Sequence, residues 1–221
     1  MLEQVMNRYS DAIMDTDRDM ALQIVRDAVD LGISHEEIVF NVVVPAIEMM
    51  MKLISENQGV SLAQHFMAAQ IASEVVDEMV PQFKQAPEIV GTVVIGTSQG
   101  DFHGLGKRIV SGCLKAMMVE VCDLGLNVAP ERFVDEALAQ NAQVIAISSM
   151  MVHTATGDNG CRQVRQLLKE RGLEDRIRIA VGGAPYRFDP GLYKSVGADG
   201  WAENGITAGR VITGLIREVL G

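Results

Sequence analysis

The sequence predicts two domains of different class: an all-α helical bundle over residues 1–86, followed by an α/β domain with a doubly wound, five-stranded parallel sheet over residues 87–221. In the first half, apolar residues recur at three- and four-residue steps, as in Ala21, Ile24, Val25, Ala28 and Leu31. In the second half, short β-branched runs alternate with amphipathic stretches. Such alternation indicates a parallel sheet covered by helices on both faces, of the Rossmann or flavodoxin-like type.

Two capping boxes mark helix starts in the first half. Ser34 is followed three residues later by Glu37, and Ser61 by Gln64, so a new helix is expected directly after each serine. Pro45 should divide or bend the helical segment that contains it, because proline lacks a backbone N–H. The first half is therefore expected to contain several helices joined by short turns.

The linker between the two halves is expected at residues 81–87, which contain two prolines with polar neighbours. Beyond it, strands are expected at residues 90–97, 119–122, 144–147, 177–181 and 199–202. Helices are expected at residues 106–117, 131–140, 159–171 and 204–219. The loops that follow the strands should gather at one edge of the sheet, where open α/β sheets bind their ligands.

Composition and charge exclude several classes of partner. The chain has 221 residues and a formal net charge of -10 without any basic run, so neither nucleic acid nor an anionic membrane is an expected partner. No apolar stretch reaches the roughly 20 residues that a membrane-spanning helix needs. Cys113, Cys122 and Cys161 lack metal-ligand spacing and are interpreted as reduced thiols, which predicts a cytoplasmic protein.

The most informative segment is the loop after the first expected strand, which contains Asp101 and His103. The Asp101 carboxylate can accept the N–H of one ring nitrogen of His103, which fixes the tautomer of the imidazole. The other ring nitrogen then keeps a free lone pair for a metal. The loop is therefore predicted to present one metal ligand at the ligand-binding edge of the sheet.

The spacing Gly100-Asp101-x-His103-x-x-Gly106-Lys107 resembles the DxHxxG signature of cobalamin-binding domains, which occur in cobalamin-dependent methionine synthase and in the corrinoid proteins of methyltransferase systems. Further similar segments are Cys122-Asp123-Leu124-Gly125, Ser148-Ser149-Met150 with Thr154, Val181-Gly182-Gly183-Ala184-Pro185 and Gly197-Ala198-Asp199-Gly200. The resemblance covers essentially all of residues 90–221. Three positions depart from the family pattern: Gly104 replaces an acidic or amide residue, Met150 replaces leucine and Val152 replaces threonine.

The resemblance implies that the chain binds cobalamin with its dimethylbenzimidazole base displaced from cobalt and with His103 as the lower axial ligand. Asp101 would hydrogen-bond that histidine, and Thr154 would extend the hydrogen-bond chain. Ser148 would pair with the displaced base. Lys107 would either contact a corrin amide or phosphate or be solvated. The other residues implied to line the cofactor are Phe102, Gly104, Leu105, Gly106, Met150, Gly182, Gly183 and Ala184. The glycine pair has a second explanation, a tight turn between strand and loop.

The helical half is implied to cover the upper face of the corrin, with His65 and Phe66 on a helix there. Cobalamin-dependent photoreceptors use a histidine on such a helix as the upper ligand, directly after an acidic residue and with a tryptophan earlier in the chain. This sequence has Gln64 and Ile54 at those two positions. The sensor motif is therefore incomplete. His65 is expected either to lie at the upper face of the corrin or to be a half-buried residue of its helix.

The resemblance favours a corrinoid carrier, which takes a methyl group from a substrate-specific methyltransferase and passes it to an acceptor methyltransferase. Such a carrier subunit need not be a complete enzyme, because the cofactor supplies the chemistry while the protein sets axial ligation, access and docking. A cobalamin-dependent sensor or regulator is the alternative. A flavodoxin-like domain without cobalamin would leave the histidine loop, the serine loop and the glycine pair unexplained.

Overall fold

The computed structural model describes the chain except residues 56–58, 60 and 84–88. The chain forms two compact units: a helical unit of Met1–Glu88 with Lys115–Met117, and an α/β unit of Ile89–Leu114 with Met118–Gly221. The expected combination of an all-α part and an α/β part is confirmed. The expected boundary between residues 86 and 87, and most of the expected linker, lie outside the described residues, so that boundary stays a prediction.

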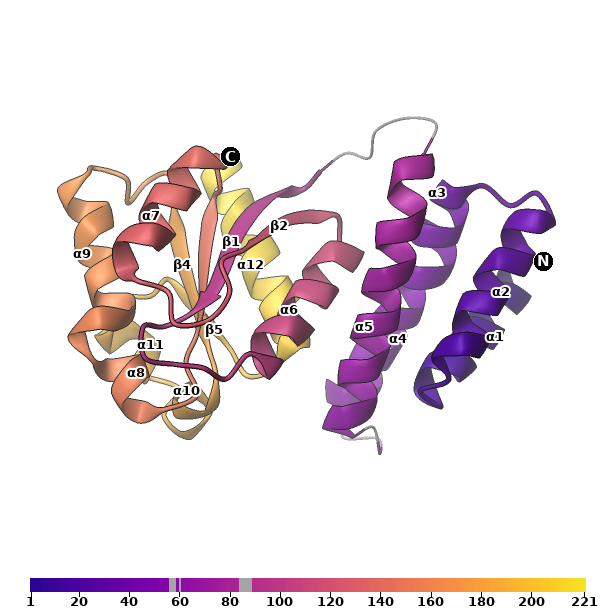
Figure 1. Cartoon of the computed structure of the whole chain (residues 1–221), viewed down its shortest axis with the longest axis horizontal. Coiled ribbons are helices and arrows are strands. Elements are labelled where there is room, and N and C mark those ends of the chain that lie inside the picture. Colours follow the sequence, from indigo (N-terminus) through magenta and orange to yellow (C-terminus); the bar gives the residue numbers. More distant parts are fainter. Residues whose placement is uncertain (56–58, 60, 84–88) are drawn as a thin grey trace. The chain divides into compact units, whose positions relative to one another are not determined.

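The helical unit contains α1 (Leu2–Met14), α2 (Arg18–Asp30), α3 (His35–Ile38), α4 (Val44–Ser55) and α5 (Leu62–Met79), with a π-helical turn at Val39–Val43 and a 3₁₀ turn at Val80–Gln82 (Figure 1). Both capping boxes are present. The side chains of Ser34 and Ser61 each accept a hydrogen bond from the backbone N–H three residues later. The side chains of Glu37 and Gln64 in turn accept the backbone N–H of the capping serine. The π-helical turn ends two residues before Pro45, whose ring and missing N–H disturb a regular α-helix.

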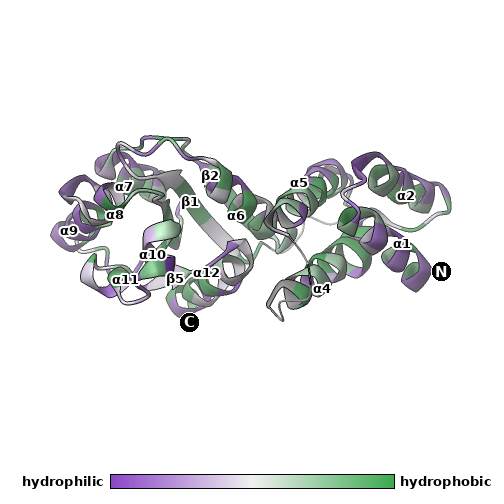
Figure 2. Ribbon diagram, turned by 90° about the horizontal axis from the view of Figure 1, so that it is seen from below, coloured by the Kyte–Doolittle hydropathy of each residue, from purple (hydrophilic) through white to green (hydrophobic). Residues whose placement is uncertain are grey.

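The core of the helical unit is formed by the apolar side of each helix (Figure 2). Its fully buried residues include Tyr9, Ile13, Val25, Ile38, Val42, Met50, Ile71 and Val75. The hydroxyl of Tyr9 is buried among them, and the described part of the chain offers it no hydrogen-bond partner. Burial raises the pKa of the Tyr9 phenol, because the charged form loses its solvation.

The α/β unit is built on five parallel strands in the order β2-β1-β3-β4-β5 (Figure 1). The strands are β1 (Gly91–Thr97), β2 (Val119–Asp123), β3 (Val144–Ser148), β4 (Arg178–Gly182) and β5 (Gly200–Ala202). The longer helices are α6 (Leu105–Ala116), α7 (Pro130–Ala139), α9 (Gln163–Glu170) and α12 (Gly205–Leu220). Every strand and helix expected in this half is present, with ends that differ by a few residues.

Helices cover both faces of the sheet, as the alternation predicts (Figure 1, Figure 2). One face packs against α7 and α9 through a cluster that includes Val94, Phe133, Val134, Ile145, Val164, Leu168 and Ile179. The other face packs against α6 and α12 through Val93, Ile95, Leu114, Val144, Ile212 and Ile216. Successive strand residues point to opposite faces, so each strand contributes to both clusters and reads as a continuous apolar run.

Three short helices were not expected from the sequence: α8 (Val152–Thr156), α10 (Ala184–Phe188) and α11 (Leu192–Ser195). A helix of four or five residues is too short to show an apolar period or to form alone in water. The expected helix at residues 159–171 begins with a π-helical segment, Asp158–Arg162, in which Asn159 and Gly160 have non-helical backbone angles. α8 buries Thr154 and Ala155, and α10 buries Pro185 and Tyr186, so packing rather than local propensity stabilises these two short helices.

The strand order places a topological switch point between β1 and β3, because the chain leaves β1 toward β2 on one side and later returns to β3 on the other. The crevice outside the carboxyl ends of these two strands is the general ligand site of such sheets. The loop after β1 contains Asp101 and His103, and the loop after β3 contains Thr154. In the described ranges, no helix is both long and apolar enough to cross a membrane.

Candidate functional site

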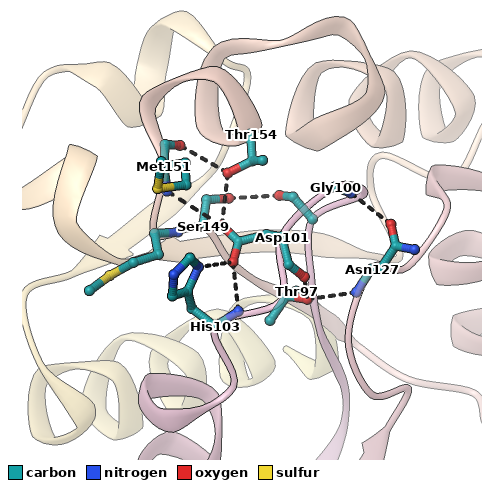
Figure 3. A network of polar contacts seen from close by, with 10 residues as sticks. Thr97, Gly100, Asp101, His103, Asn127, Ser149, Met151 and Thr154 are labelled. Carbon is teal, nitrogen blue, oxygen red and sulfur yellow. Dashed lines mark hydrogen bonds and ion pairs between the residues drawn. The ribbon is translucent and has the colours of Figure 1, made fainter.

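The loop after β1 holds His103 and Asp101 in contact (Figure 3). Oδ1 of Asp101 lies 3.0 Å from Nδ1 of His103 and accepts the backbone N–H of His103 at 2.9 Å. The imidazole side chain is 55% exposed, whereas the carboxylate is fully buried. Because the carboxylate accepts a hydrogen bond from the Nδ1–H group, Nε2 keeps its lone pair and is free to bind a metal at the crevice.

The second oxygen of Asp101 joins this loop to the loop after β3. Oδ2 accepts the backbone N–H of Met150 at 2.6 Å and the hydroxyl of Thr154 at 2.8 Å (Figure 3). Burial by itself raises the pKa of this carboxyl, but the hydrogen bonds from His103, Met150 and Thr154 outweigh burial and lower the pKa of Asp101 to about 2. Asp101 is therefore a carboxylate at any physiological pH.

The backbone of the histidine loop is held by residues that the sequence analysis did not single out. Thr97 Oγ1 donates to the carbonyl of Asp101 at 2.6 Å and accepts the backbone N–H of Asn127 at 2.8 Å. Oδ1 of Asn127 accepts the backbone N–H of Gly100 at 2.7 Å (Figure 3). Asn127 lies in the loop between β2 and α7, so a third loop contributes to the site.

A buried pair of hydroxyls connects the loops after β1 and β3. The Oγ atoms of Ser98 and Ser149 are 2.6 Å apart, and both side chains are buried. The backbone N–H of Ser98 donates to the carbonyl of Ser148, and that of Ser149 donates to the carbonyl of Gly182. Ser149 stands in the segment Ser148-Ser149-Met150 that resembles the cobalamin-binding family, whereas the only signal for Ser98 is a polar side chain directly after an apolar strand, which is too common to identify it.

Large apolar side chains surround His103 at the surface. Phe102 is 66% exposed and Leu105 is 54% exposed, and the loop after β3 adds Met150 at 50%. Exposed apolar side chains gathered around a polar group are typical of a ligand-binding face. A large, partly apolar ligand that covered Phe102, Leu105 and Met150 would therefore be stabilised, because it would remove their apolar surface from water.

The small residues of the expected site form a strip on the sheet face that α6 and α12 cover. Ser148 and Gly182 are register partners at the ends of β3 and β4. A Cβ atom added to Gly106 would come no closer than 3.9 Å to Ser148 Oγ, and one added to Gly182 would come no closer than 3.4 Å to Ala202 O. Neither glycine is therefore required by packing within the protein, because a methyl group would fit at each position.

The neighbouring glycine has a different explanation. Gly183 has a φ of +120°, and a Cβ atom at this position would lie 2.0 Å from the carbonyl oxygen of Ser149. Gly183 is thus required by the turn itself, and it leads directly into α10, which begins with Ala184. Gly104 is half-buried against Leu126, which lies 3.0 Å from the position of an added Cβ atom. The tight-turn explanation therefore applies to Gly183, while the ligand explanation stays a prediction for Gly182.

Lys107 does not take either of its expected roles. Its side chain is only 4% exposed, and its Nζ pairs with both carboxylate oxygens of Asp123 at the end of β2. A buried lysine that is paired with a carboxylate is not available to a cofactor amide or phosphate, because breaking the pair would leave the buried ammonium without a counter-charge. The pair instead ties the start of α6 to β2.

The helical residues expected near the cofactor lie at the start of α5. Phe66 is half-buried in this helix. The side chain of His65 lies outside the described part of the chain, and the helical unit is described separately from the α/β unit. The role of His65 at the upper face of the corrin, and with it the sensor alternative, stays a prediction.

The donor set of this site fits a cofactor that brings its own metal. Within the described residues, no three His, Cys, Asp or Glu side chains come together as a metal cage. His103 is a single exposed donor in an apolar surround, whereas proteins that bind a metal by themselves usually supply three or four ligands. A metal held in a macrocycle needs only one axial ligand from the protein, so cobalamin fits the residues present.

Comparison with known proteins agrees with this geometry. Residues 91–208 match a family model described as "B12 binding domain", and residues 5–79 match a second model with the same description. Trimethylamine corrinoid protein 1 of Methanosarcina acetivorans is 32% identical over 208 residues, which cover 91% of this chain and 92% of that protein. Dimethylamine corrinoid protein 2 of Methanosarcina mazei is 33% identical over 205 residues, with 91% and 92% covered.

Solved structures share the fold at lower identity. A cobalamin-binding protein from Desulfitobacterium hafniense is similar with a TM-score of 0.74 at 20% identity, over 95% of this chain and 98% of that chain. A chain of the methanol:cobalamin methyltransferase complex from Methanosarcina barkeri gives a TM-score of 0.75 at 21% identity, over 97% and 80%. The chain therefore belongs to the family of methyltransferase-associated corrinoid proteins with a B12-binding domain, and its cofactor is cobalamin.

Proposed function

We propose that this protein carries a methyl group on the cobalt of cobalamin between two methyltransferase proteins, and that His103 is the lower axial ligand of that cobalt. The single observation that carries the proposal is the contact between Nδ1 of His103 and the buried carboxylate of Asp101. This contact leaves the lone pair of Nε2 free to bind a metal at the switch point of the sheet. When bound, cobalamin would supply the metal that takes up and releases the methyl group.

The residues around His103 would orient the ligand and tune its basicity. Asp101 stays ionised, since the hydrogen bonds it accepts lower the pKa of its carboxyl to about 2. Its negative charge strengthens the donor character of the imidazole, and the Thr154 hydroxyl and the Met150 N–H balance part of that charge. This arrangement supports a ligand that binds cobalt through nitrogen and loosens when the charge on cobalt changes.

The residues that would receive the displaced base are the small ones of the sheet strip. Ser148 offers a hydroxyl at the end of β3, and Gly106 and Gly182 leave room beside it. A nitrogen of dimethylbenzimidazole that has left the metal would otherwise be buried without a partner, at a cost of about 1–3 kcal/mol. We therefore assign Ser148 to the base and His103 to the cobalt.

The methyl donor and the acceptor are proposed to be delivered by separate proteins. Relatives named trimethylamine and dimethylamine corrinoid proteins support a methylamine as the source of the methyl group. A related structure was solved as a complex with a methyltransferase, which supports docking of this chain to an enzyme of that class. A cytoplasmic location is proposed because the three cysteines are free thiols, two of them buried.

The experiment that tests the axial ligand uses protein labelled uniformly with ¹⁵N and reconstituted with unlabelled hydroxocobalamin. After reduction to Co(II), electron paramagnetic resonance distinguishes an axial ¹⁵N of the protein, which splits each cobalt line in two, from the ¹⁴N of the base, which splits it in three. We expect the two-line pattern, and we expect His103→Ala to remove it. His153→Ala is the matched control, because His153 is an exposed histidine on α8 in the neighbouring loop.

The experiment that tests the carrier role first reduces the cobalt of the reconstituted protein to Co(I) with a low-potential chemical reductant such as titanium(III) citrate, because only Co(I) can accept a methyl cation from an amine. The reduced protein is then supplied with an amine-specific methyltransferase and either trimethylamine or dimethylamine. We expect a change of the visible spectrum to that of the methylated cofactor only when enzyme and amine are both present. Failure to retain cobalamin would refute the whole proposal. Retention with a three-line pattern would refute the assignment of His103 alone.

A further inference from the structure

The segment before Asp101 is a β-turn of defined type. The backbone N–H of Asp101 donates to the carbonyl of Ser98 at 2.9 Å, which closes a four-residue turn with Gln99 and Gly100 at its centre. Gly100 has a φ of +82°, whereas Gln99 is not among the described non-glycine residues with positive φ. A turn with a negative φ at its second residue and a φ near +80° at its third is type II.

Type I and type II turns differ by a flip of the central peptide, here the one between Gln99 and Gly100. Glycine at the third position favours type II but also tolerates type I, so the local sequence alone does not exclude the flipped form. The flip reverses the direction of the Gly100 N–H. A hydrogen-bond acceptor that meets this N–H in the type II form therefore selects that form.

Asn127 supplies the acceptor. Its Oδ1 lies 2.7 Å from the backbone nitrogen of Gly100, while its own backbone N–H donates to the carbonyl of Asp101 at 3.0 Å and to Thr97 Oγ1 at 2.8 Å (Figure 3). The side chain thus holds the central peptide of the turn, and the backbone N–H holds the carbonyl of Asp101, the last residue of the turn. Asn127 itself has a φ of +53°, a conformation that asparagine adopts more readily than most residues.

We propose that Asn127 is a positioning residue for the axial ligand: it locks the turn before Asp101 in its type II form and thereby fixes the carboxylate that orients His103. This inference rests on the proposed role of His103 as a cobalt ligand. Asn127 touches neither the imidazole nor the carboxylate, so its effect passes through the backbone of Gly100 and Asp101. Loss of the Asn127 side chain would let the Gln99–Gly100 peptide flip. The Asp101 carboxylate would then be held less firmly, and His103 would adopt a wider range of orientations.

Three substitutions separate this role from a general effect on folding. Asn127→Gly removes Oδ1 but keeps the backbone N–H and accepts the positive φ, whereas Asn127→Asp keeps an acceptor oxygen. Gly100→Ala disfavours the φ of +82° without a collision, since its Cβ would lie 3.7 Å from Thr154 Cγ2. Asn141→Gly is the matched control, because Asn141 has a φ of +50° and precedes β3 at the opposite edge of the sheet.

The first measurement uses the protein without cofactor. Nuclear magnetic resonance follows the ¹⁵N and ¹H shifts of the Gly100 amide and its hydrogen exchange. We expect exchange to be roughly fivefold faster in Asn127→Gly, the change that corresponds to loss of one net hydrogen bond. Asn127→Asp should restore protection, and Asn141→Gly should leave it unchanged.

The second measurement uses the ¹⁵N-labelled protein reconstituted with hydroxocobalamin and reduced to Co(II). We expect Asn127→Gly and Gly100→Ala each to reduce the proportion of nitrogen-ligated cobalt, because each destabilises the type II form of the turn. Ligation equal to that of the unaltered protein in both single variants would overturn the inference. So would a Gly100 amide that exchanges at the same rate in Asn127→Gly as in the unaltered protein.

Failure of the inference is distinguishable from failure of the proposed function. If the unaltered protein gives no two-line pattern, His103 is not the ligand and the proposed function fails on that point. If it gives the pattern and Asn127→Gly gives it equally, only the role of Asn127 is refuted.

Discussion

Asp101→Asn is the substitution that tests the site most directly in the protein without cofactor. In the folded protein both carboxylate oxygens accept hydrogen bonds, Oδ1 from His103 and Oδ2 from Met150 and Thr154. An asparagine keeps one acceptor oxygen but places an NH₂ group against donors on its other side. The variant therefore loses hydrogen bonds and buries an unfavourable pairing of donors.

The size of the effect follows from the pKa of Asp101. Its hydrogen bonds, opposed by burial, lower the pKa from an ordinary value of 3.8 to about 2, which corresponds to about 2 kcal/mol of folding free energy. Because the folded pKa is the lower one, this contribution is fully present above the unfolded pKa near 4 and is lost as the pH falls toward 2. Asp101→Asn should thus be about 2 kcal/mol less stable at pH 7, with a difference that shrinks below about pH 4.

Urea unfolding followed by tryptophan fluorescence measures this difference in the correct part of the chain. The sequence has one tryptophan, Trp201, which lies in β5 of the α/β unit. The transition should be recorded at pH 7, 5 and 3 for the unaltered protein, for Asp101→Asn and for the control Asp175→Asn, whose side chain is exposed in the same unit. A loss below about 0.5 kcal/mol at pH 7, typical of surface substitutions, or a loss that persists at full size at pH 3, would refute the reasoning.

Three further outcomes are expected. Thr154→Val should destabilise the α/β unit by about 1 kcal/mol, the net value of one hydrogen bond, and should add little to Asp101→Asn in a double-mutant cycle. Gly182→Ala should fold with nearly unchanged stability yet bind cobalamin more weakly. Gly183→Ala should lose about 3 kcal/mol or more of folding free energy, since its Cβ would lie 2.0 Å from a backbone carbonyl oxygen. Thermal unfolding measures the loss of stability, and cofactor titration measures the loss of affinity. Tyr9→Phe should stabilise the helical unit, by up to about 1 kcal/mol, because it removes a buried hydroxyl for which the described residues show no partner, and circular dichroism during heating would detect it.

The elements of the fold could be predicted because each depends on local chemistry. The capping boxes at Ser34 and Ser61 join residues three apart, and the β-branched runs of the sheet show their apolar character within five to seven residues. The contact between Asp101 and His103 spans two residues, so its pairing could also be read from the sequence. The short helices such as α8 could not, because they form only when the loops pack.

The tertiary structure decided the long-range pairings that hold the site together, of which only the one between Asp101 and Thr154 was implied by the family resemblance. Asp101 meets Thr154 across 53 positions, Ser98 meets Ser149 across 51, and Gly100 meets Asn127 across 27. These distances along the chain are closed by the parallel register of β1 with β2 and β3, which brings three loops to one edge of the sheet. Local sequence carries no record of such pairings, because register is set by the packing of whole strands and helices.

The same distinction applies to individual side chains. The sequence identified the chemical groups that a cobalt ligand and its partner require, and the resemblance named the cofactor. It could not tell that Gly183 is required by its backbone while Gly182 is not, or that Lys107 is paired with Asp123. Those differences depend on which atoms lie beside a residue in space, and the order of residues along the chain does not contain that information.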